Sequence, residues 1–174
     1  MYCGELRMEQ VGQEVVLCGW VQRQRDKGGL IFVDLRDRTG ICQITVDADS
    51  AEEVKAKAKS LRMEYCICVK GKVLERASKN PNIPTGDVEV YATGMKILSE
   101  SETPPFMIEE NSKANDALRL TYRYLDLRRP DIQKNIMMRH QVTKLCRDYF
   151  DRHGFLEIET PMLIKSTPEG ARDY

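Results

Sequence analysis

Residues 154–163 read Gly-Phe-Leu-Glu-Ile-Glu-Thr-Pro-Met-Leu, and this pattern joins the end of a helix to a short strand. The glycine suits the C-terminal stop of a helix, because it adopts a left-handed backbone without a steric cost. The residues from Phe155 to Ile158 are typical of a brief strand, which Pro161 interrupts. This junction therefore predicts a helix followed by a strand near the end of the chain.

A long amphipathic helix precedes that glycine. Pro130 is acceptable in the first turn of a helix, so we expect the helix to begin there. Along it, apolar residues recur at three-to-four-residue spacing, which predicts one apolar stripe: Met138, Val142, Leu145 and Tyr149. Residues 116–129 predict one further helix just before it.

Residues 15–98 have a different pattern, in which short apolar runs are separated by glycine-containing turns such as Asp26 to Gly29. The runs predict strands at 15–21, 30–35, 41–46, 65–74 and 87–98, with a short helix at 51–60. Three strands, a helix and two strands favour the five-stranded Greek-key barrel called the OB-fold. Another small β-barrel is the alternative.

The chain as a whole is thus predicted to be a β-rich α+β protein. We expect an OB-fold domain at residues 1–98 and a linker at 99–115, where Ser, Glu, Pro and Asn replace the apolar runs. Residues 116–174 would form the helix–strand start of a second domain, too short to complete it.

Charge and hydropathy exclude several classes of protein. The 174 residues carry 27 Lys or Arg and 27 Asp or Glu, so no global basic field indicates nucleic acid, although a local basic face is still allowed. No apolar run approaches the roughly 20 residues that cross a bilayer. The N-terminus lacks the features of a signal peptide, so we expect a cytoplasmic protein without a membrane partner.

Six cysteines stand at positions 3, 18, 42, 66, 68 and 146. Cys66 and Cys68 are separated by one residue, whereas zinc-binding pairs usually have two to four between them. Strand alternation places these two on the same face. We expect reduced thiols that pack as small hydrophobic side chains and predict no metal site; a metal or disulfide role is the alternative.

The first hairpin of the expected barrel carries candidate binding residues. Arg23 and Arg25 share one face of their strand, Phe32 lies on the next strand and Gln43 on the third. A cationic fork, a stackable ring and an amide on adjacent strands suit unpaired nucleic-acid bases. Alternatively, Phe32 is an ordinary core residue and the arginines only solvate an edge.

Two further motifs carry a family resemblance. Residues 121–130 read Thr-Tyr-Arg-Tyr-Leu-Asp-Leu-Arg-Arg-Pro, and residues 166–174 read Ser-Thr-Pro-Glu-Gly-Ala-Arg-Asp-Tyr. The hairpin, the first motif and the helix–Gly154–Pro161 unit occur in the order seen in subclass IIb aminoacyl-tRNA synthetases, which the chain resembles. The second motif looks like the loop that closes over the amino acid in bacterial aspartyl-tRNA synthetases.

The resemblance implies roles for particular residues. Phe32 would stack on the central anticodon base of a tRNA, Gln43 would hydrogen-bond to that base, and Arg25 would lie at the anticodon face. Glu169 would contact the ammonium of bound L-aspartate. Residues Gly154 to Leu163, with Gly154 and Pro161 as interface residues, would belong to motif 1, which forms the homodimer interface of class II enzymes together with the preceding helix.

The resemblance also implies ATP and Mg²⁺ as cofactors of the intact enzyme, an aspartate–tRNA ligase. The motifs that hold ATP would lie beyond Tyr174, so we expect this chain alone to be inactive and assign it no catalytic residue. A stand-alone OB-fold protein that binds single-stranded nucleic acid is the main alternative. The motif at 166–174 argues against an asparaginyl or lysyl enzyme.

Overall fold

The structure, a computed structural model, describes residues 1–163 of the chain. The chain divides into two compact units, Met1–Met107 and Ile108–Tyr174.

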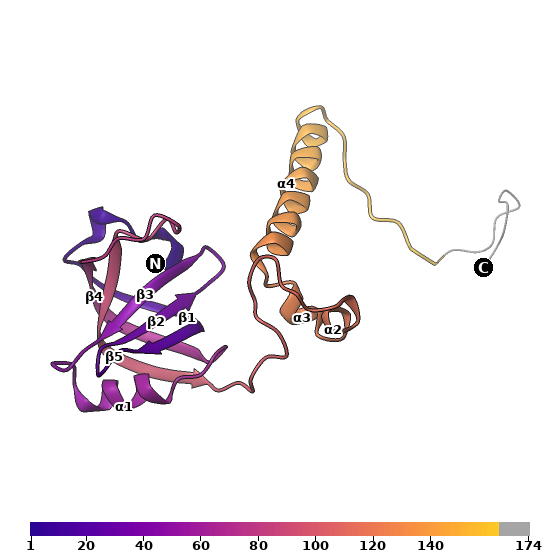
Figure 1. Cartoon of the computed structure of the whole chain (residues 1–174). Coiled ribbons are helices and arrows are strands. Elements are labelled where there is room, and N and C mark those ends of the chain that lie inside the picture. The colour runs from indigo at the N-terminus through magenta and orange to yellow at the C-terminus, as the bar shows by residue number, and fades with distance from the viewer. Residues whose placement is uncertain (164–174) are drawn as a thin grey trace, which may run out of the picture. The chain divides into compact units, whose positions relative to one another are not determined.

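The first unit is a closed five-stranded barrel with the strand order β1-β2-β3-β5-β4 (Figure 1). The strands are β1 (Glu14–Asp26), β2 (Ile31–Arg36), β3 (Ile41–Val46), β4 (Cys66–Glu75) and β5 (Val88–Ser99). Helix α1 (Glu52–Ser60) follows β3, and two short 3-10 helices, η1 (Cys3–Glu5) and η2 (Met8–Gln10), precede β1. The predicted OB-fold, with its five strands and the helix after the third, is therefore confirmed; the two 3-10 helices were not predicted.

Neighbouring strands pair antiparallel except for β3 and β5, which run parallel over the pairs Gln43↔Glu89, Ile44↔Val90 and Thr45↔Tyr91. This short parallel ladder closes the barrel. Because side chains alternate across each strand, the middle pair points into the barrel and the other two pairs point outward.

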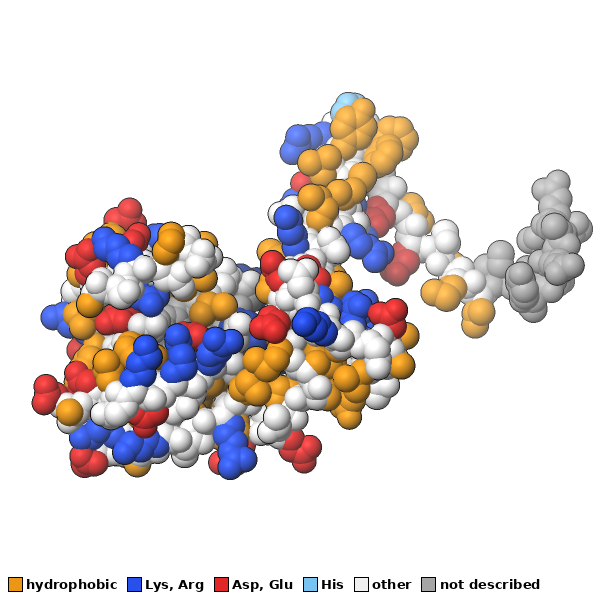
Figure 2. All heavy atoms as spheres, viewed as in Figure 1, with side chains coloured by type: hydrophobic (Ala, Val, Ile, Leu, Met, Phe, Trp, Pro, Cys, Tyr) orange, Lys and Arg blue, Asp and Glu red, His pale blue; other side chains and the backbone are white. Residues whose placement is uncertain are grey.

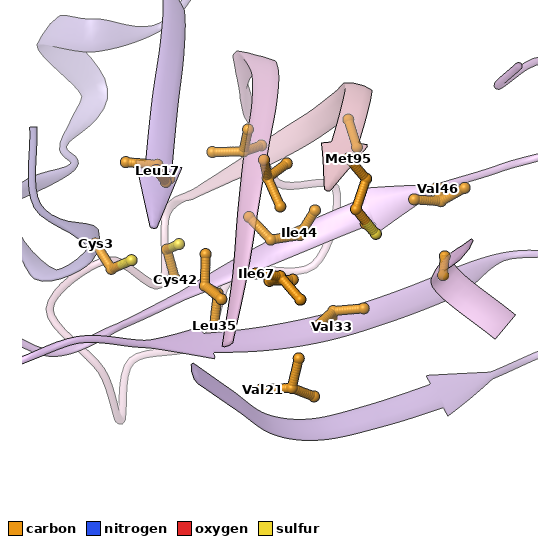
Figure 3. Packing of buried hydrophobic residues seen from close by; sticks show 14 of the residues in the cluster. Cys3, Leu17, Val21, Val33, Leu35, Cys42, Ile44, Val46, Ile67 and Met95 are labelled. Atoms are coloured by element: carbon orange, nitrogen blue, oxygen red, sulfur yellow. The ribbon is translucent and has the colours of Figure 1, made fainter. Parts of the chain in front are cut away.

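The interior of the barrel is filled by apolar side chains from all five strands (Figure 3). Leu17, Val33, Ile44, Ile67 and Val90 are completely buried. Burial alternates along most of β1, β2, β4 and β5, whereas five consecutive residues of β3 are buried. Such burial contributes about 1.5–3 kcal/mol for each large apolar side chain, so the barrel has a core of its own.

The second unit begins with α2 (Asp116–Thr121) and α3 (Arg123–Asp126), which are two short helices. The predicted single helix over 116–129 is therefore wrong. Tyr122 interrupts it with a backbone at φ −106° and ψ 46°, outside the helical region. The break brings Asp126 back towards Arg119, so local polar contacts outweigh helical propensity here.

Asp126 is the polar centre of this unit. Its carboxylate is completely buried and accepts hydrogen bonds from Arg119 Nε at 3.0 Å, Arg123 Nη1 at 2.6 Å and Arg129 Nη1 at 3.0 Å. The hydrogen bond from Arg119, supported by Arg129, lowers the pKa of Asp126 against the opposing effect of burial. Arg129 also donates through Nε to the carbonyl of Glu109, which ties the start of the unit to this cluster.

Helix α4 (Pro130–Arg152) begins at Pro130, as predicted, and ends in a Schellman motif. Gly154 has φ +77°, its N–H donates to the carbonyl of Asp151, and the N–H of Phe155 donates to the carbonyl of Phe150. The rings of Phe150 and Phe155 lie 5.5 Å apart and complete the motif. The predicted helix stop at the glycine is confirmed.

The predicted strand after that glycine is wrong, because residues 155–158 have no regular secondary structure. A strand needs a neighbouring strand to satisfy its backbone groups, and the described part of this unit contains none. The apolar stripe of α4 is exposed, and Figure 2 shows hydrophobic side chains gathered along this helix. The side chains of Met138, Val142, Leu145 and Tyr149 are all more than half exposed.

Among residues 1–163, no helix is both long enough and apolar enough to pass through a lipid bilayer.

The β4–β5 ladder gives a first prediction. A Cβ on Gly71 would overlap the carbonyl oxygen of Tyr91, whereas a Cβ on Gly94 of the same ladder would meet nothing closer than the Lys70 Cβ at 3.8 Å. We expect Gly71→Ala to lower the free energy of unfolding by about 1–3 kcal/mol, because strand backbones must move apart. Urea denaturation measures this change. Gly94→Ala is the matched control, expected within about 0.5 kcal/mol of the parent; equal losses from both changes would contradict the packing argument.

The Asp126 cluster gives a second prediction. A pKa lowered by folding means that the charged carboxylate stabilises the folded form, so this stability is full above about pH 4 and is lost as the pH falls through the lowered pKa. Asp126→Asn removes that pH dependence and leaves the buried Arg129 with only the partly exposed Asp131 as a carboxylate partner. Removing one partner of a buried pair costs about 3–5 kcal/mol. Amide hydrogen exchange of residues 116–129 as a function of pH measures both effects.

Asp116→Asn is the control for this prediction. Asp116 pairs with the same Arg119 at 3.1 Å, but its side chain is 89% exposed. Exposed pairs contribute about 0–1 kcal/mol, so exchange should change little. Equal loss of protection in both variants would show that Asp126 is no anchor of this unit.

Candidate nucleic-acid interface

A hollow of about 400 Å³ opens on the outer surface of the barrel. We call it the outer hollow and define it by the residues that carry its chemistry: Arg25, Phe32, Gln43, Arg76, Glu89 and Tyr91. All three of the residues expected to bind the anticodon therefore line the same depression.

Strand register explains why these side chains meet. Arg25 of β1 pairs with Phe32 of β2, Phe32 pairs with Thr45 of β3, and Thr45 pairs with Tyr91 of β5. Directly paired residues point to the same side of a sheet, so the four form one row across the barrel surface. A second row, parallel to the first, runs from Asp34 through Gln43 to Glu89.

The first row presents a cation next to a ring. The guanidinium carbon of Arg25 lies 5.9 Å from the centroid of the Phe32 ring, within the range of a cation–π contact. Phe32 is half-buried rather than enclosed in the core. Phe32 is therefore not one of the fully buried residues of the core, and part of its side chain is accessible.

Arg25 is held in place by Asp34, whose Oδ1 lies 2.6 Å from Arg25 Nη2. Burial raises the pKa of Asp34 above its ordinary value, and the nearby cations, Arg25 first, oppose that rise. Arg25 Nε is buried and makes no hydrogen bond within the described part of the chain. A buried donor without a partner costs free energy, which an acceptor on a bound ligand would relieve.

The second row fixes an amide. Gln43 is only 6% exposed; its Nε2 donates to Glu89 Oε2 at 2.8 Å, and its Oε1 accepts from Arg76 Nη2 at 3.0 Å. Because Glu89 can only accept and Arg76 can only donate, the Nε2 of Gln43 faces Glu89 and the Oε1 faces Arg76. One N–H and one lone pair of the amide are left for a ligand.

Tyr91 provides a second ring at the far end of the first row. Its hydroxyl donates to Asp47 Oδ1 at 2.9 Å, and Ser50 Oγ donates to the same hydroxyl at 3.1 Å. The bond from Tyr91 is the main cause that lowers the pKa of Asp47. The ring is thereby held against the wall of the outer hollow.

Sequence reasoning missed Arg76, Glu89 and Tyr91. The alternation Val88-Glu89-Val90-Tyr91 indicates that Glu89 and Tyr91 face outward, but not which strand lies beside them. Only the closure of the barrel by β3 and β5 brings them next to Gln43 and Thr45. Arg76 follows the end of β4 and carries no pattern of its own.

The other expected site residues lie elsewhere. Gly154 is the left-handed residue that ends α4, and Pro161 lies in the exposed segment after it. Glu169 lies outside the described residues. Within residues 1–163, no group of three or more His, Cys, Asp or Glu side chains is arranged to hold a metal ion.

Family comparisons match both parts of the chain. Residues 15–98 match the family described as "OB-fold nucleic acid binding domain", and residues 115–174 match "tRNA synthetases class II (D, K and N)". The first match contains every residue of the outer hollow. The second contains the Asp126 cluster and α4.

Relatives and solved structures agree with these matches. The chain is 58% identical over 174 residues to the aspartate–tRNA(Asp/Asn) ligase of Thermoanaerobacter pseudethanolicus. It is also 58% identical over 172 residues to the aspartate–tRNA ligase of Clostridium perfringens. Each match covers 99% of this chain and 29% of the relative. Asparaginyl-tRNA synthetase from Pyrococcus horikoshii, solved with asparaginyl-adenylate, superimposes with a TM-score of 0.83 at 31% identity, covering 98% of this chain and 38% of that one. The chain thus spans under a third of the length of the curated relatives it matches.

Proposed function

The chain belongs to the class II aminoacyl-tRNA synthetases of the aspartate, lysine and asparagine group, and from this premise we propose that it is the anticodon-binding part and the start of the ligase domain of an aspartate–tRNA ligase. The whole enzyme joins L-aspartate to its tRNA at the expense of ATP. The unit Met1–Met107 binds the anticodon loop, and the outer hollow receives the bases.

The single observation that carries this proposal is the arrangement of the outer hollow. An accessible ring, an oriented amide and a guanidinium with an unused donor meet on one barrel surface. Duplex RNA hides its base edges, whereas unpaired loop bases can stack on rings and expose their Watson–Crick edges. An anticodon loop is such a substrate.

The fixed amide of Gln43 suits one base in particular. Aspartate codons are read by anticodons with uracil at the centre. Uracil offers the N3–H as donor and O4 as acceptor, which complement the free lone pair and the free N–H of an amide. Phe32 supplies the stacking surface, and Arg25 lies beside it to neutralise the backbone or to bind a base edge.

The remaining roles follow from the family. Glu169 binds the ammonium of aspartate in the whole enzyme, and ATP with Mg²⁺ activates the aspartate carboxylate. The motif 2 and motif 3 arginines that hold ATP are not among these 174 residues, so we propose that the chain by itself does not aminoacylate tRNA. We place the activity in the cytoplasm, where tRNA is charged for protein synthesis.

A homodimer through motif 1 is also part of this proposal. The α4 stripe is exposed along its length, and the side chain of Leu145 is the most exposed of the four at 71%. Contiguous apolar surfaces of this kind usually mark an interaction site. Residues Gly154 to Pro161 would pair with their counterparts in a second copy and gain the neighbouring strand that they lack here.

The anticodon prediction uses stem–loop RNAs that carry either the aspartate anticodon or the same loop with the central uracil replaced by cytosine. Cytosine keeps the ring size but reverses the hydrogen-bonding edge, so stacking is retained and base reading is lost. We expect the parent chain to prefer uracil by about 1–3 kcal/mol, the range for a good two-bond base contact. Fluorescence anisotropy at two salt concentrations separates this preference from phosphate attraction.

Two variants separate the contribution of base stacking from the contribution of base recognition to the binding free energy in this assay. Phe32→Leu should weaken both RNAs by about 1–3 kcal/mol, because stacking is lost whatever the base. Gln43→Met should leave the cytosine RNA nearly unchanged and abolish the preference for uracil. Tyr2→Leu is the matched control, since Tyr2 is an exposed aromatic with an arginine, Arg38, 4.7 Å from its ring centroid but outside the outer hollow.

Equal, salt-sensitive binding of both RNAs by the parent chain would instead favour the alternative, a nonspecific single-strand binder. An effect of Tyr2→Leu as large as that of Phe32→Leu would move the binding surface away from the outer hollow.

The dimer prediction concerns Leu145. We expect Leu145→Lys to weaken self-association by about tenfold or more, because burying an unpaired charge in an apolar interface is costly. Sedimentation velocity over a concentration series measures it. His140→Lys adds the same charge on the opposite side of α4 and should leave the dissociation constant within about threefold; a monomeric parent chain would refute the dimer for these 174 residues.

A further inference from the structure

Cys18 and Cys68 face each other across the β1–β4 ladder. They are direct partners in a register that runs from Glu14↔Lys72 to Trp20↔Cys66 without a shift. Both therefore lie on the outer surface of the barrel, where Cys18 is exposed and Cys68 is half-exposed.

The hydrogen-bonding pattern shows which kind of pair this is. In the continuation of the same register, Val21 N–H donates to the carbonyl of Tyr65, and Val73 N–H donates to the carbonyl of Gln13. Hydrogen-bonded and non-hydrogen-bonded pairs alternate along an antiparallel ladder, so Cys18 and Cys68 form a non-hydrogen-bonded pair. Such pairs have Cα atoms about 4.5 Å apart, at the short end of the 4.4–6.8 Å range of disulfides.

The two thiols influence each other. The neighbouring Cys68 thiol is the first of the causes that raise the pKa of Cys18 to about 11. Cys66, in contrast, is opposite Trp20, so it is not the direct partner of Cys18. The Cys66-Ile67-Cys68 motif thus contributes only its second thiol to the pair.

A second thiol pair in the same barrel provides an internal comparison. Cys3 is likewise the first of the causes that raise the pKa of Cys42, but both residues are completely buried at one end of the core (Figure 3). The expectation of reduced thiols packed as small hydrophobic side chains describes this pair well. The exposure of Cys18 makes the outer pair chemically different.

We propose that Cys18 and Cys68 are a reversible dithiol–disulfide site that is oxidised by low-molecular-weight disulfides. The Cys18 thiolate attacks one sulfur of the oxidant R–S–S–R, which gives a Cys18–S–S–R mixed disulfide and releases one RS⁻. The Cys68 thiolate then attacks the Cys18 sulfur and releases the second RS⁻. Two protein thiols lose two electrons and two protons, and the oxidant becomes two molecules of RSH.

The geometry sets the relative rates of these steps. The first attack is slow at neutral pH, because only the thiolate is a nucleophile and the Cys18 thiol is weakly acidic. The second step joins two sulfurs on directly paired residues of one ladder and is therefore effectively unimolecular. A mixed disulfide at Cys18 should consequently not accumulate while Cys68 is present.

The test treats the reduced 174-residue chain with oxidised glutathione at about pH 9, where more thiolate forms, and maps the products by tryptic mass spectrometry. We expect a Cys18–Cys68 crosslink without lasting glutathionylation of Cys18. Cys68→Ser should instead accumulate glutathione on Cys18. The exposed Cys146 should take up glutathione in every sample and reports that the oxidant works.

Cys66→Ser is the matched control, because residues 63–70 form one tryptic peptide that carries both Cys66 and Cys68. The crosslink should survive in Cys66→Ser and disappear in Cys68→Ser. Oxidation should also raise the Tm of the barrel by roughly 10 °C, since it closes a long loop of the unfolded chain, and dithiothreitol should reverse the shift.

Each other outcome overturns the proposal. Stable glutathione on Cys18 in the parent chain would mean that Cys68 cannot reach it. A crosslink that survives in Cys68→Ser would assign the partner to Cys66, and an unmodified Cys18 beside a modified Cys146 would mean that the outer pair is inert.

Discussion

The three-residue parallel ladder between β3 and β5 is the constraint on which both the barrel and its site depend. Its middle pair, Ile44 and Val90, lies in the core, and its outer pairs place Gln43 beside Glu89 and Thr45 beside Tyr91. Barrel closure removes the free edges of the sheet. The same contact also orients the amide of Gln43, because Glu89 is one of its two hydrogen-bond partners. Folding and site assembly are thus a single event in this unit.

Local sequence patterns predicted the strands and helix ends that depend on interactions between residues close in sequence. Alternation and turn residues located all five strands and α1, and the glycine at 154 located the end of α4 within two residues. The pattern also placed Arg25, Phe32 and Gln43 on neighbouring strands as candidate binding residues, with a core role for Phe32 left open, and all three line the outer hollow. What it could not supply was strand order, since β5 lies between β3 and β4 through contacts far apart in sequence. Arg76 and Glu89 were missed for that reason.

The incorrect predictions fall in the second unit, where patterns depend on absent neighbours. Residues 155–158 read as a strand but have no strand to pair with among the described residues. The helix expected at 116–129 breaks at Tyr122, and Asp126 then accepts hydrogen bonds from three arginines within seven residues of it, local side-chain contacts that helix propensity does not include. The barrel has an apolar core, whereas this unit buries the Asp126 carboxylate with few apolar side chains, Ile108 and Leu125 among them, and exposes the apolar stripe of α4.

The two sites proposed for the barrel share β1 but use different parts of it. Cys18 lies in the half of β1 that pairs with β4, and Arg25 lies in the half that pairs with β2. Between them the β1–β2 register shifts at Val21/Arg23, a bulge that locally increases twist and separates the two outward surfaces. A crosslink at Cys18 would therefore fasten the β1–β4 ladder without entering the outer hollow. Its effect on RNA would act through the stability of the barrel, because neither cysteine contributes a side chain to base recognition.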